Sequence, residues 1–239
     1  MTPRQTAAPV TLERFGDPRA LAKRFRRNRP FEHLVFDGFT NEGIGSELLT
    51  ELPPPGSMLS GGGSRGRRFY LRDVAALGPS FKALDGFLRC AALLKWLRRI
   101  TGHKSLIPNP RGDCGGLFYD ECGMELAPHI DVNCTVPGRR RAATLLLYLN
   151  ARWRPDWGGM LELSRGSGTP AKKEIPPSFN RCVLMASHEN SWHGYRAIRT
   201  PPGGPRGRWV LISNYYRLKR AKDTPPHYNV NRCYETGTI

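Results

Sequence analysis

The sequence of 239 residues contains no run of 18 apolar residues, the length at which a helix can cross a bilayer. Its first 30 residues are basic and lack the apolar segment of a secretory signal. A membrane protein and a secreted protein are therefore not expected, and the composition favours a cytoplasmic protein.

The six cysteines include no C-x-x-C pair, so their spacing does not match a structural zinc site. In a chain long enough to bury a core, scattered cysteines are typical of reduced, small apolar side chains rather than of a disulfide framework. Cys114 and Cys122 lie near the candidate metal ligands described below, and a structural role is favoured for both.

Acidic residues are scarce. The chain has 37 Lys and Arg against 20 Asp and Glu, a formal net charge of +17. Such a charge indicates either a solvated basic surface or an acidic partner, which could be a nucleic acid, an acidic peptide or a phosphate-bearing substrate. The charge alone does not decide among these partners. The sequence does not indicate an oligomeric state.

Helices are expected early in the chain. Apolar periodicity and capping residues predict them at 18–27, 41–52 and 81–100. Residues 57–68 are glycine-rich and basic without apolar periodicity, which indicates either a lid over a site or an ordinary surface loop. Residues 164–176 form a second expected loop.

Short apolar runs separated by Gly, Pro and Asn follow the helices, and we expect strands near 30–37, 115–119, 126–133, 142–150, 159–163, 182–186 and 209–216. Helices followed by many short strands predict a mainly β fold with flanking helices, a barrel or jelly roll buttressed by the N-terminal helices. We expect a basic N-terminal arm at 1–29, one domain at 30–220 and a C-terminal tail at 221–239.

His129 and Asp131 are separated by one residue, so in a strand both side chains point to the same side. His193, in the sequence Ser191-Trp192-His193-Gly194, is the expected third ligand. Two histidines and one carboxylate can occupy one face of Fe(II) and leave the other positions open. His188 is a rival third ligand.

These residues belong to an ordered series of motifs that resembles the Fe(II)/2-oxoglutarate-dependent dioxygenases, and most of all their prolyl 4-hydroxylase-like branch. The motifs are Leu126–Asn133, Ala142–Asn150, Asp156–Leu163, Pro177–Arg181, Ser191–Gly194 and Arg206–Tyr216. The resemblance covers residues 115–216, and residues 30–52 more loosely. It implies a double-stranded β-helix, the jelly-roll core also called cupin-like.

The resemblance assigns roles around the co-substrate. Arg208 would pair with the distal carboxylate of 2-oxoglutarate, with Arg206 as the fallback. Tyr148 and Tyr119 match positions where relatives hydrogen-bond that carboxylate, and Leu161 would pack against the carbon chain.

The chain departs from the family pattern at Val210, where many members have a serine, so one hydrogen bond to the oxo-acid is expected to be missing.

The implied cofactors are Fe(II), 2-oxoglutarate and O2, with ascorbate as a supporting reductant. The implied reaction is hydroxylation of an aliphatic C–H bond of an amino-acid-like, peptidyl or small-metabolite substrate, with release of succinate and CO2. Asp131 favours hydroxylation over halogenation and leaves desaturation open.

Two alternative functions are kept. One is a nucleic-acid demethylase, although Asn214 stands where those enzymes carry a second arginine. The other is a non-catalytic basic domain that binds RNA or acidic partners.

Overall fold

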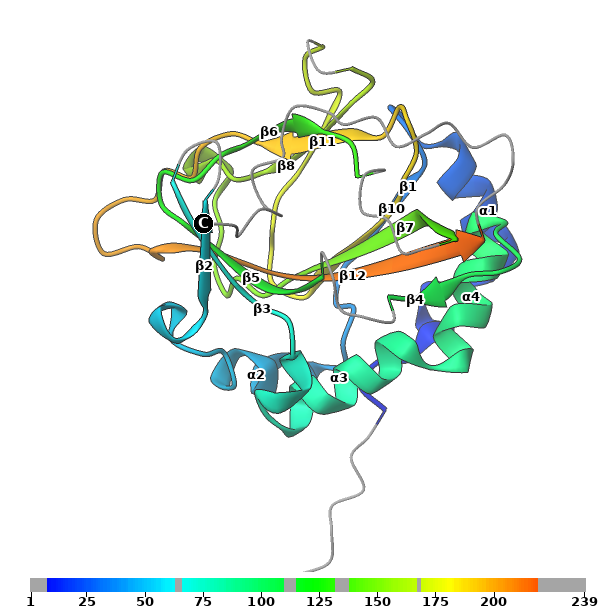
Figure 1. Cartoon of the computed structure of the whole chain (residues 1–239), viewed down its shortest axis with the longest axis horizontal. Coiled ribbons are helices and arrows are strands. Elements are labelled where there is room, and N and C mark those ends of the chain that lie inside the picture. The colour runs from blue at the N-terminus through cyan, green and yellow to red at the C-terminus, as the bar shows by residue number, and fades with distance from the viewer. Residues whose placement is uncertain (1–7, 63–65, 110–114, 132–137, 167–168, 219–239) are drawn as a thin grey trace, which may run out of the picture.

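Two antiparallel sheets face one another, and helices cover the outer side of the larger sheet (Figure 1). The computed structural model describes residues 8–62, 66–109, 115–131, 138–166 and 169–218. Within these residues the larger sheet has eight strands in the order β1-β10-β7-β12-β5-β3-β2, with β4 paired to β12. The smaller sheet has four strands in the order β6-β11-β8-β9.

The α-helices are α1 (Pro18–Arg27), α2 (Glu42–Thr50), α3 (Pro79–Arg89) and α4 (Ala91–Thr101). The strands are β1 (His33–Phe36), β2 (Leu59–Gly62), β3 (Arg67–Leu71), β4 (Ile107–Pro108), β5 (Gly116–Glu121), β6 (Leu126–His129), β7 (Arg139–Tyr148), β8 (Leu161–Ser164), β9 (Lys173–Ile175), β10 (Arg181–Ala186), β11 (Trp192–Tyr195) and β12 (Gly207–Leu218). The expected mainly β fold with N-terminal helices is confirmed.

Strand β7 shows how the sheets divide the interior into two cores. Leu145 and Leu147 point to the helices and join the larger core, which we call the helix-side core. Leu146 and Tyr148 point to the smaller sheet and join a second core. Successive side chains of a strand face opposite sides, so an apolar run buried on both faces separates two cores. The candidate functional residues lie on the side of the smaller sheet.

The expected helix at 81–100 is two helices, because Cys90 interrupts it in an extended conformation (φ −72°, ψ 155°). The Cys90 sulfur accepts a hydrogen bond from the backbone of Leu93 at 3.4 Å and caps α4. The break changes the buried face, so that Leu93 and Trp96 are buried where unbroken periodicity favours Ala91 and Leu94.

Two further expectations need correction. Part of 57–68 is a pair of antiparallel strands, β2 and β3, rather than a loop without regular structure. The expected N-terminal arm is not loose throughout, since Val10 and, on α1, Leu21 and Phe25 are buried in the helix-side core. The expected tail at 221–239 lies outside the described residues.

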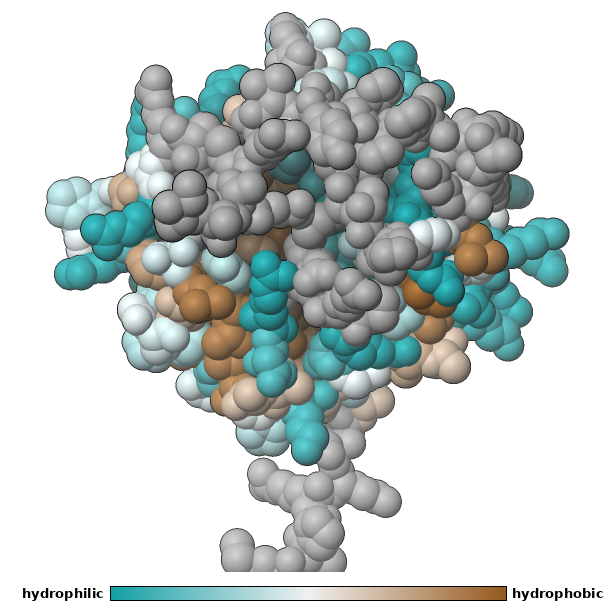
Figure 2. Space-filling view, viewed as in Figure 1, coloured by the Kyte–Doolittle hydropathy of each residue, from teal (hydrophilic) through white to brown (hydrophobic). Residues whose placement is uncertain are grey.

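None of the helices among the described residues is both long and apolar enough to cross a membrane. On the face shown in Figure 2, hydrophilic residues cover much of the described surface, and apolar residues gather below the centre of the view, where β3, α2 and α3 lie in Figure 1.

Candidate metal centre and arginine ladder

His129 and His193 lie directly opposite one another on the paired strands β6 and β11. Their ring centroids are 4.3 Å apart. Each Nδ1 lies 3.0 Å from a backbone carbonyl two residues earlier, of Ala127 and Ser191 respectively. With each Nδ1–H donated to that carbonyl, both Nε2 atoms are left as acceptors for a metal.

Gly194 is required next to His193 because a Cβ atom there would lie 2.4 Å from the carbonyl oxygen of Leu126. This close approach holds β11 against β6 and brings the two histidines together.

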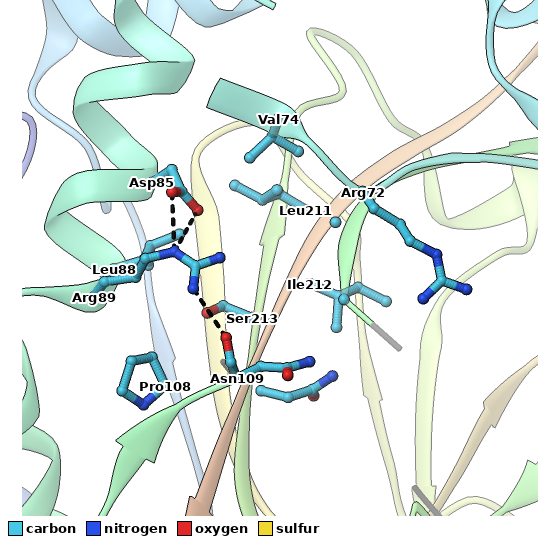
Figure 3. Close-up of a pocket in the computed structure, with 13 residues that line it drawn as sticks. Arg72, Val74, Asp85, Leu88, Arg89, Pro108, Asn109, Leu211, Ile212 and Ser213 are labelled. Atoms are coloured by element: carbon cyan, nitrogen blue, oxygen red, sulfur yellow. Dashed lines mark hydrogen bonds and ion pairs between the residues drawn. The ribbon is translucent and has the colours of Figure 1, made fainter. Parts of the chain in front are cut away.

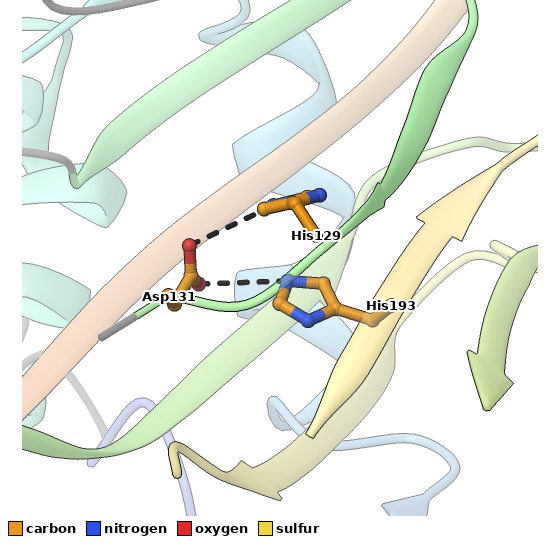
Figure 4. Close-up of side chains that lie close together, drawn as sticks. All are labelled: His129, Asp131 and His193. Atoms are coloured by element: carbon orange, nitrogen blue, oxygen red, sulfur yellow. Dashed lines mark ion pairs between the residues drawn. The ribbon is translucent and has the colours of Figure 1, made fainter. Parts of the chain in front are cut away.

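Asp131 lies just beyond the end of β6 and completes the cluster (Figure 4). Its carboxylate oxygens are 3.6 Å from Nε2 of His129 and 3.5 Å from Nε2 of His193. The expectation that Asp131 shares a regular strand with His129 is wrong, because β6 ends at His129, although both side chains still converge on one point. The ligand atoms of the three residues lie within 4.8 Å of one another.

The protonation states suit metal binding. Burial, followed by the neighbouring His193, lowers the pKa of His129 to about 4, so this imidazole is neutral at pH 7. Burial alone would raise the pKa of Asp131, but Arg141 and the two histidines hold it well below the usual value. Two imidazoles and an ionised carboxylate are the donor set that non-haem Fe(II) takes, so the residues fit this ion.

His188 lies elsewhere. Its Nε2 is 2.9 Å from the Glu32 carboxylate, and its ring stands edge-on to Phe31. The structure does not bring His188 into the cluster with His129 and Asp131.

Arg208, at the start of β12, is buried beside the smaller sheet, with 3% of its surface exposed. Its Nη1 donates to the carbonyl oxygen of Gly159 at 2.7 Å, and its guanidinium carbon lies 3.7 Å from the centre of the Tyr195 ring. A Cβ atom at Gly159 would lie 3.0 Å from side-chain atoms of both Trp153 and Ile198. The absence of a side chain at Gly159 therefore lets Trp153 and Ile198 pack against this part of the backbone.

Three charged side chains form a ladder across β3, β5 and β12. Asp120 is directly opposite Arg68 on one side and Arg208 on the other. Its carboxylate is 2.6 Å from Nε of Arg68 and 2.9 Å from Nη2 of Arg208. Burial alone would raise the pKa of Asp120, but the two arginines lower it, so the carboxylate is ionised at pH 7. We call these three residues the arginine ladder.

The structure brings two of the expected co-substrate residues to Arg208. Tyr148 is fully buried with its ring centre 5.7 Å from the Arg208 guanidinium carbon, and burial raises the pKa of its hydroxyl to about 12. Leu161 of β8 packs in the same apolar cluster as Tyr148, between the two sheets.

Tyr119 and Arg206 are not brought there. Tyr119 neighbours Asp120 in the sequence, so its side chain faces the opposite side of β5, where its ring centre lies 4.6 Å from that of Trp209 in the helix-side core. Arg206 is exposed.

The arginine ladder also fits an organic anion. The Nε atom of Arg208 is buried and has no hydrogen-bond partner, which leaves a donor for a further oxygen atom. The same holds for the hydroxyl of Tyr195. A buried guanidinium with an unused donor is suited to a carboxylate such as that of 2-oxoglutarate.

A separate cavity lies beside β12 near α3 and shares no lining residue with the metal cluster or the ladder (Figure 3). Arg89 fills part of it, held by Asp85 at 2.9 Å and donating to the carbonyl of Asn109 at 2.9 Å. These polar groups are paired within the protein, so the cavity gives no indication of a ligand.

Residues 114–216 match the family model described as the 2OG-Fe(II) oxygenase superfamily. This range includes the candidate metal ligands His129, Asp131 and His193 together with Asp120 and Arg208. No curated protein matches the chain.

Several solved structures share the fold. A prolyl hydroxylase from Trichoplax adhaerens, in complex with a hypoxia-inducible factor peptide, is 16% identical over 87% of this chain and 94% of its own, with a TM-score of 0.57. A prolyl-4-hydroxylase from Pseudomonas putida is 15% identical over 85% of this chain and 100% of its own, with a TM-score of 0.51. HygX from Streptomyces hygroscopicus, with nickel, 2-oxoglutarate and hygromycin B bound, is 17% identical over 77% of this chain and 82% of its own, with a TM-score of 0.54.

Proposed function

We propose that this protein hydroxylates an aliphatic C–H bond, because residues 114–216 match the model of the 2OG-Fe(II) oxygenase superfamily, whose members typically use Fe(II) and 2-oxoglutarate. The substrate in this proposal is amino-acid-like, peptidyl or a small metabolite, and the co-products are succinate and CO2. The convergence of His129, Asp131 and His193 on one point is the observation that carries the proposal.

In this proposal the three residues hold Fe(II), which, once bound, supplies the oxidising chemistry with 2-oxoglutarate and O2. The protein contributes positions and charges. His129 and His193 present Nε2 because their Nδ1 atoms are engaged by backbone carbonyls. Arg208 fixes the distal carboxylate of the oxo-acid, while Tyr148 and Leu161 line its path between the sheets.

The substrate class rests on structural neighbours and on charge. One neighbour holds a peptide and another holds hygromycin B, so this fold accommodates substrates of both kinds. The net charge of +17 favours an acidic substrate. For nucleic-acid demethylation there is less support, since Asn214 is buried and accepts a hydrogen bond from Thr144 at 2.9 Å, where demethylases have an arginine.

An anaerobic titration of metal-stripped protein with Fe(II) and then 2-oxoglutarate tests the proposal. A visible metal-to-ligand charge-transfer band that develops only when both are present is the expected result. A folded protein without this band would contradict the assignment. Binding of RNA with a steep salt dependence, without any such band, would instead favour a basic binding domain.

A further inference from the structure

The ring of Tyr195 stacks on the guanidinium of Arg208, with the guanidinium carbon 3.7 Å from the ring centre. Tyr195 follows His193 by two residues on β11, where the pairing with β6 shifts register between them, and its contact with Arg208 of β12 shows that its side chain faces the larger sheet. The residue therefore lies between the candidate metal ligand and the arginine expected to hold the far end of the oxo-acid.

The hydroxyl of Tyr195 is buried and makes no hydrogen bond of normal geometry, and burial together with the nearby Asp120 carboxylate raises its pKa well above the usual value. A buried hydroxyl without a partner is costly, and such groups in native proteins usually serve a ligand or a water. Nε of Arg208, which the ring of Tyr195 contacts, is also buried and unpartnered. Both donors suit an acceptor with more than one lone pair, as a carboxylate has.

The next residue on the face of β12 that carries Arg208 offers no hydroxyl. Val210, two residues later on the same face, is apolar and packs between the sheets. The facing sheet supplies a hydroxyl at Tyr195 instead.

We propose that Tyr195 is a co-substrate-binding residue whose hydroxyl donates to the distal carboxylate of 2-oxoglutarate beside Arg208. This inference rests on the proposed function. It adds a contact from the smaller sheet, so the carboxylate is held by donors from both sheets.

Tyr195→Phe tests the proposal, because it removes the hydroxyl and keeps the ring on Arg208. Tyr215→Phe is the matched control: it removes another buried hydroxyl, which donates to the carbonyl of Leu88 at 2.9 Å in the helix-side core. Binding of 2-oxoglutarate is measured anaerobically by calorimetry on Fe(II)-loaded protein. It is compared with 2-oxopentanoate, which has the same carbon chain but no distal carboxylate. Mn(II) binding, followed by electron paramagnetic resonance, reports the metal site separately.

The hydroxyl's hydrogen bond to a charged group predicts that Tyr195→Phe weakens 2-oxoglutarate binding about tenfold. Binding of 2-oxopentanoate and of Mn(II) should stay at the wild-type level, and Tyr215→Phe should leave all three unchanged. Unchanged 2-oxoglutarate affinity in Tyr195→Phe, or equal weakening of both oxo-acids, would overturn the role of Tyr195 and leave the proposed function intact. If the wild-type protein binds Mn(II) but no 2-oxoglutarate, the proposed function itself fails.

Discussion

Nη1 of Arg141 lies 2.6 Å from Oδ2 of Asp131, so a buried guanidinium from the larger sheet holds the carboxylate of the metal cluster. Arg141 is on β7, and Asp131 follows β6 of the smaller sheet. The pair thus links the two sheets next to the metal ligands. It restricts the orientation of the Asp131 carboxylate before any metal binds.

Arg141→Gln should therefore weaken metal binding. Replacing a residue that orients a metal ligand typically lowers metal affinity about 10–100-fold. Titration with Mn(II) under electron paramagnetic resonance measures the change. Arg140→Gln is the control, since this neighbour pairs with Glu189 rather than with Asp131. Equal Mn(II) affinity in the two variants would contradict the positioning role.

His129→Ala should abolish Fe(II) binding and turnover while the protein remains folded, because His129 is only partly buried. His188→Ala should retain both properties, since His188 is paired with Glu32 outside the cluster. Fe(II) binding by calorimetry and circular dichroism of both variants provide the comparison. Product formation by His129→Ala would remove this residue from the ligand set.

The metal-free protein should lose stability as the pH falls from about 6.5 to about 4. His129 has a pKa of about 4 in the folded protein, against 6.5 when unperturbed, so the unfolded chain binds more protons in this window. The contribution is fully present above pH 6.5. Urea denaturation at several pH values should give a steeper decline for the wild type than for His129→Gln. Parallel curves for the two proteins would show that His129 titrates normally.

Asp120→Asn should destabilise the protein by about 3–5 kcal/mol, because it leaves two buried guanidinium groups without their shared carboxylate. Asp156→Asn breaks an exposed ion pair with Arg154 and should cost no more than about 1 kcal/mol. Urea denaturation at pH 7 measures both free energies of unfolding. A small effect at Asp120 would mean that the arginine ladder does not stabilise the fold.

Arg208→Ala should weaken 2-oxoglutarate binding about 10–100-fold, the cost of losing hydrogen bonds to a charged group. Arg206→Ala should bind the oxo-acid as the wild type does, since Arg206 is exposed. The intensity of the charge-transfer band at increasing 2-oxoglutarate concentration gives both affinities. A loss confined to Arg206→Ala would transfer the role to that residue.

The structure brings together the three residues that the sequence singled out, because His129 and Asp131 are neighbours in the chain and His193 lies in a motif of the resembled family. One intervening residue separates His129 from Asp131, and a glycine that permits close strand approach follows His193. The order of the later strands was also predictable, since each is a short apolar run between turn residues. Strand β11 was missed, because Trp192–Tyr195 has no apolar alternation.

The arginine ladder was not predicted, because its contacts join residues 52 and 88 positions apart. Arg68 lies in a glycine-rich basic segment whose composition is typical of a loop, and only its pairing with β5 reveals a strand. The one available signal was the Phe69–Tyr70 aromatic pair that follows Arg68. The break at Cys90 was not predicted for a different reason, which is that the apolar periodicity of the sequence continues through it.

Side chains alternate between the two faces of β5, so the number of residues in this strand matters. Tyr119 and Asp120 are adjacent and face opposite cores, so a single inserted or deleted residue in this strand would exchange them. Arg208 would then face a phenol in place of a carboxylate, and Arg68 would lose its partner across the strand. The length of this strand, as much as the identity of its residues, therefore sets the charge beside Arg208.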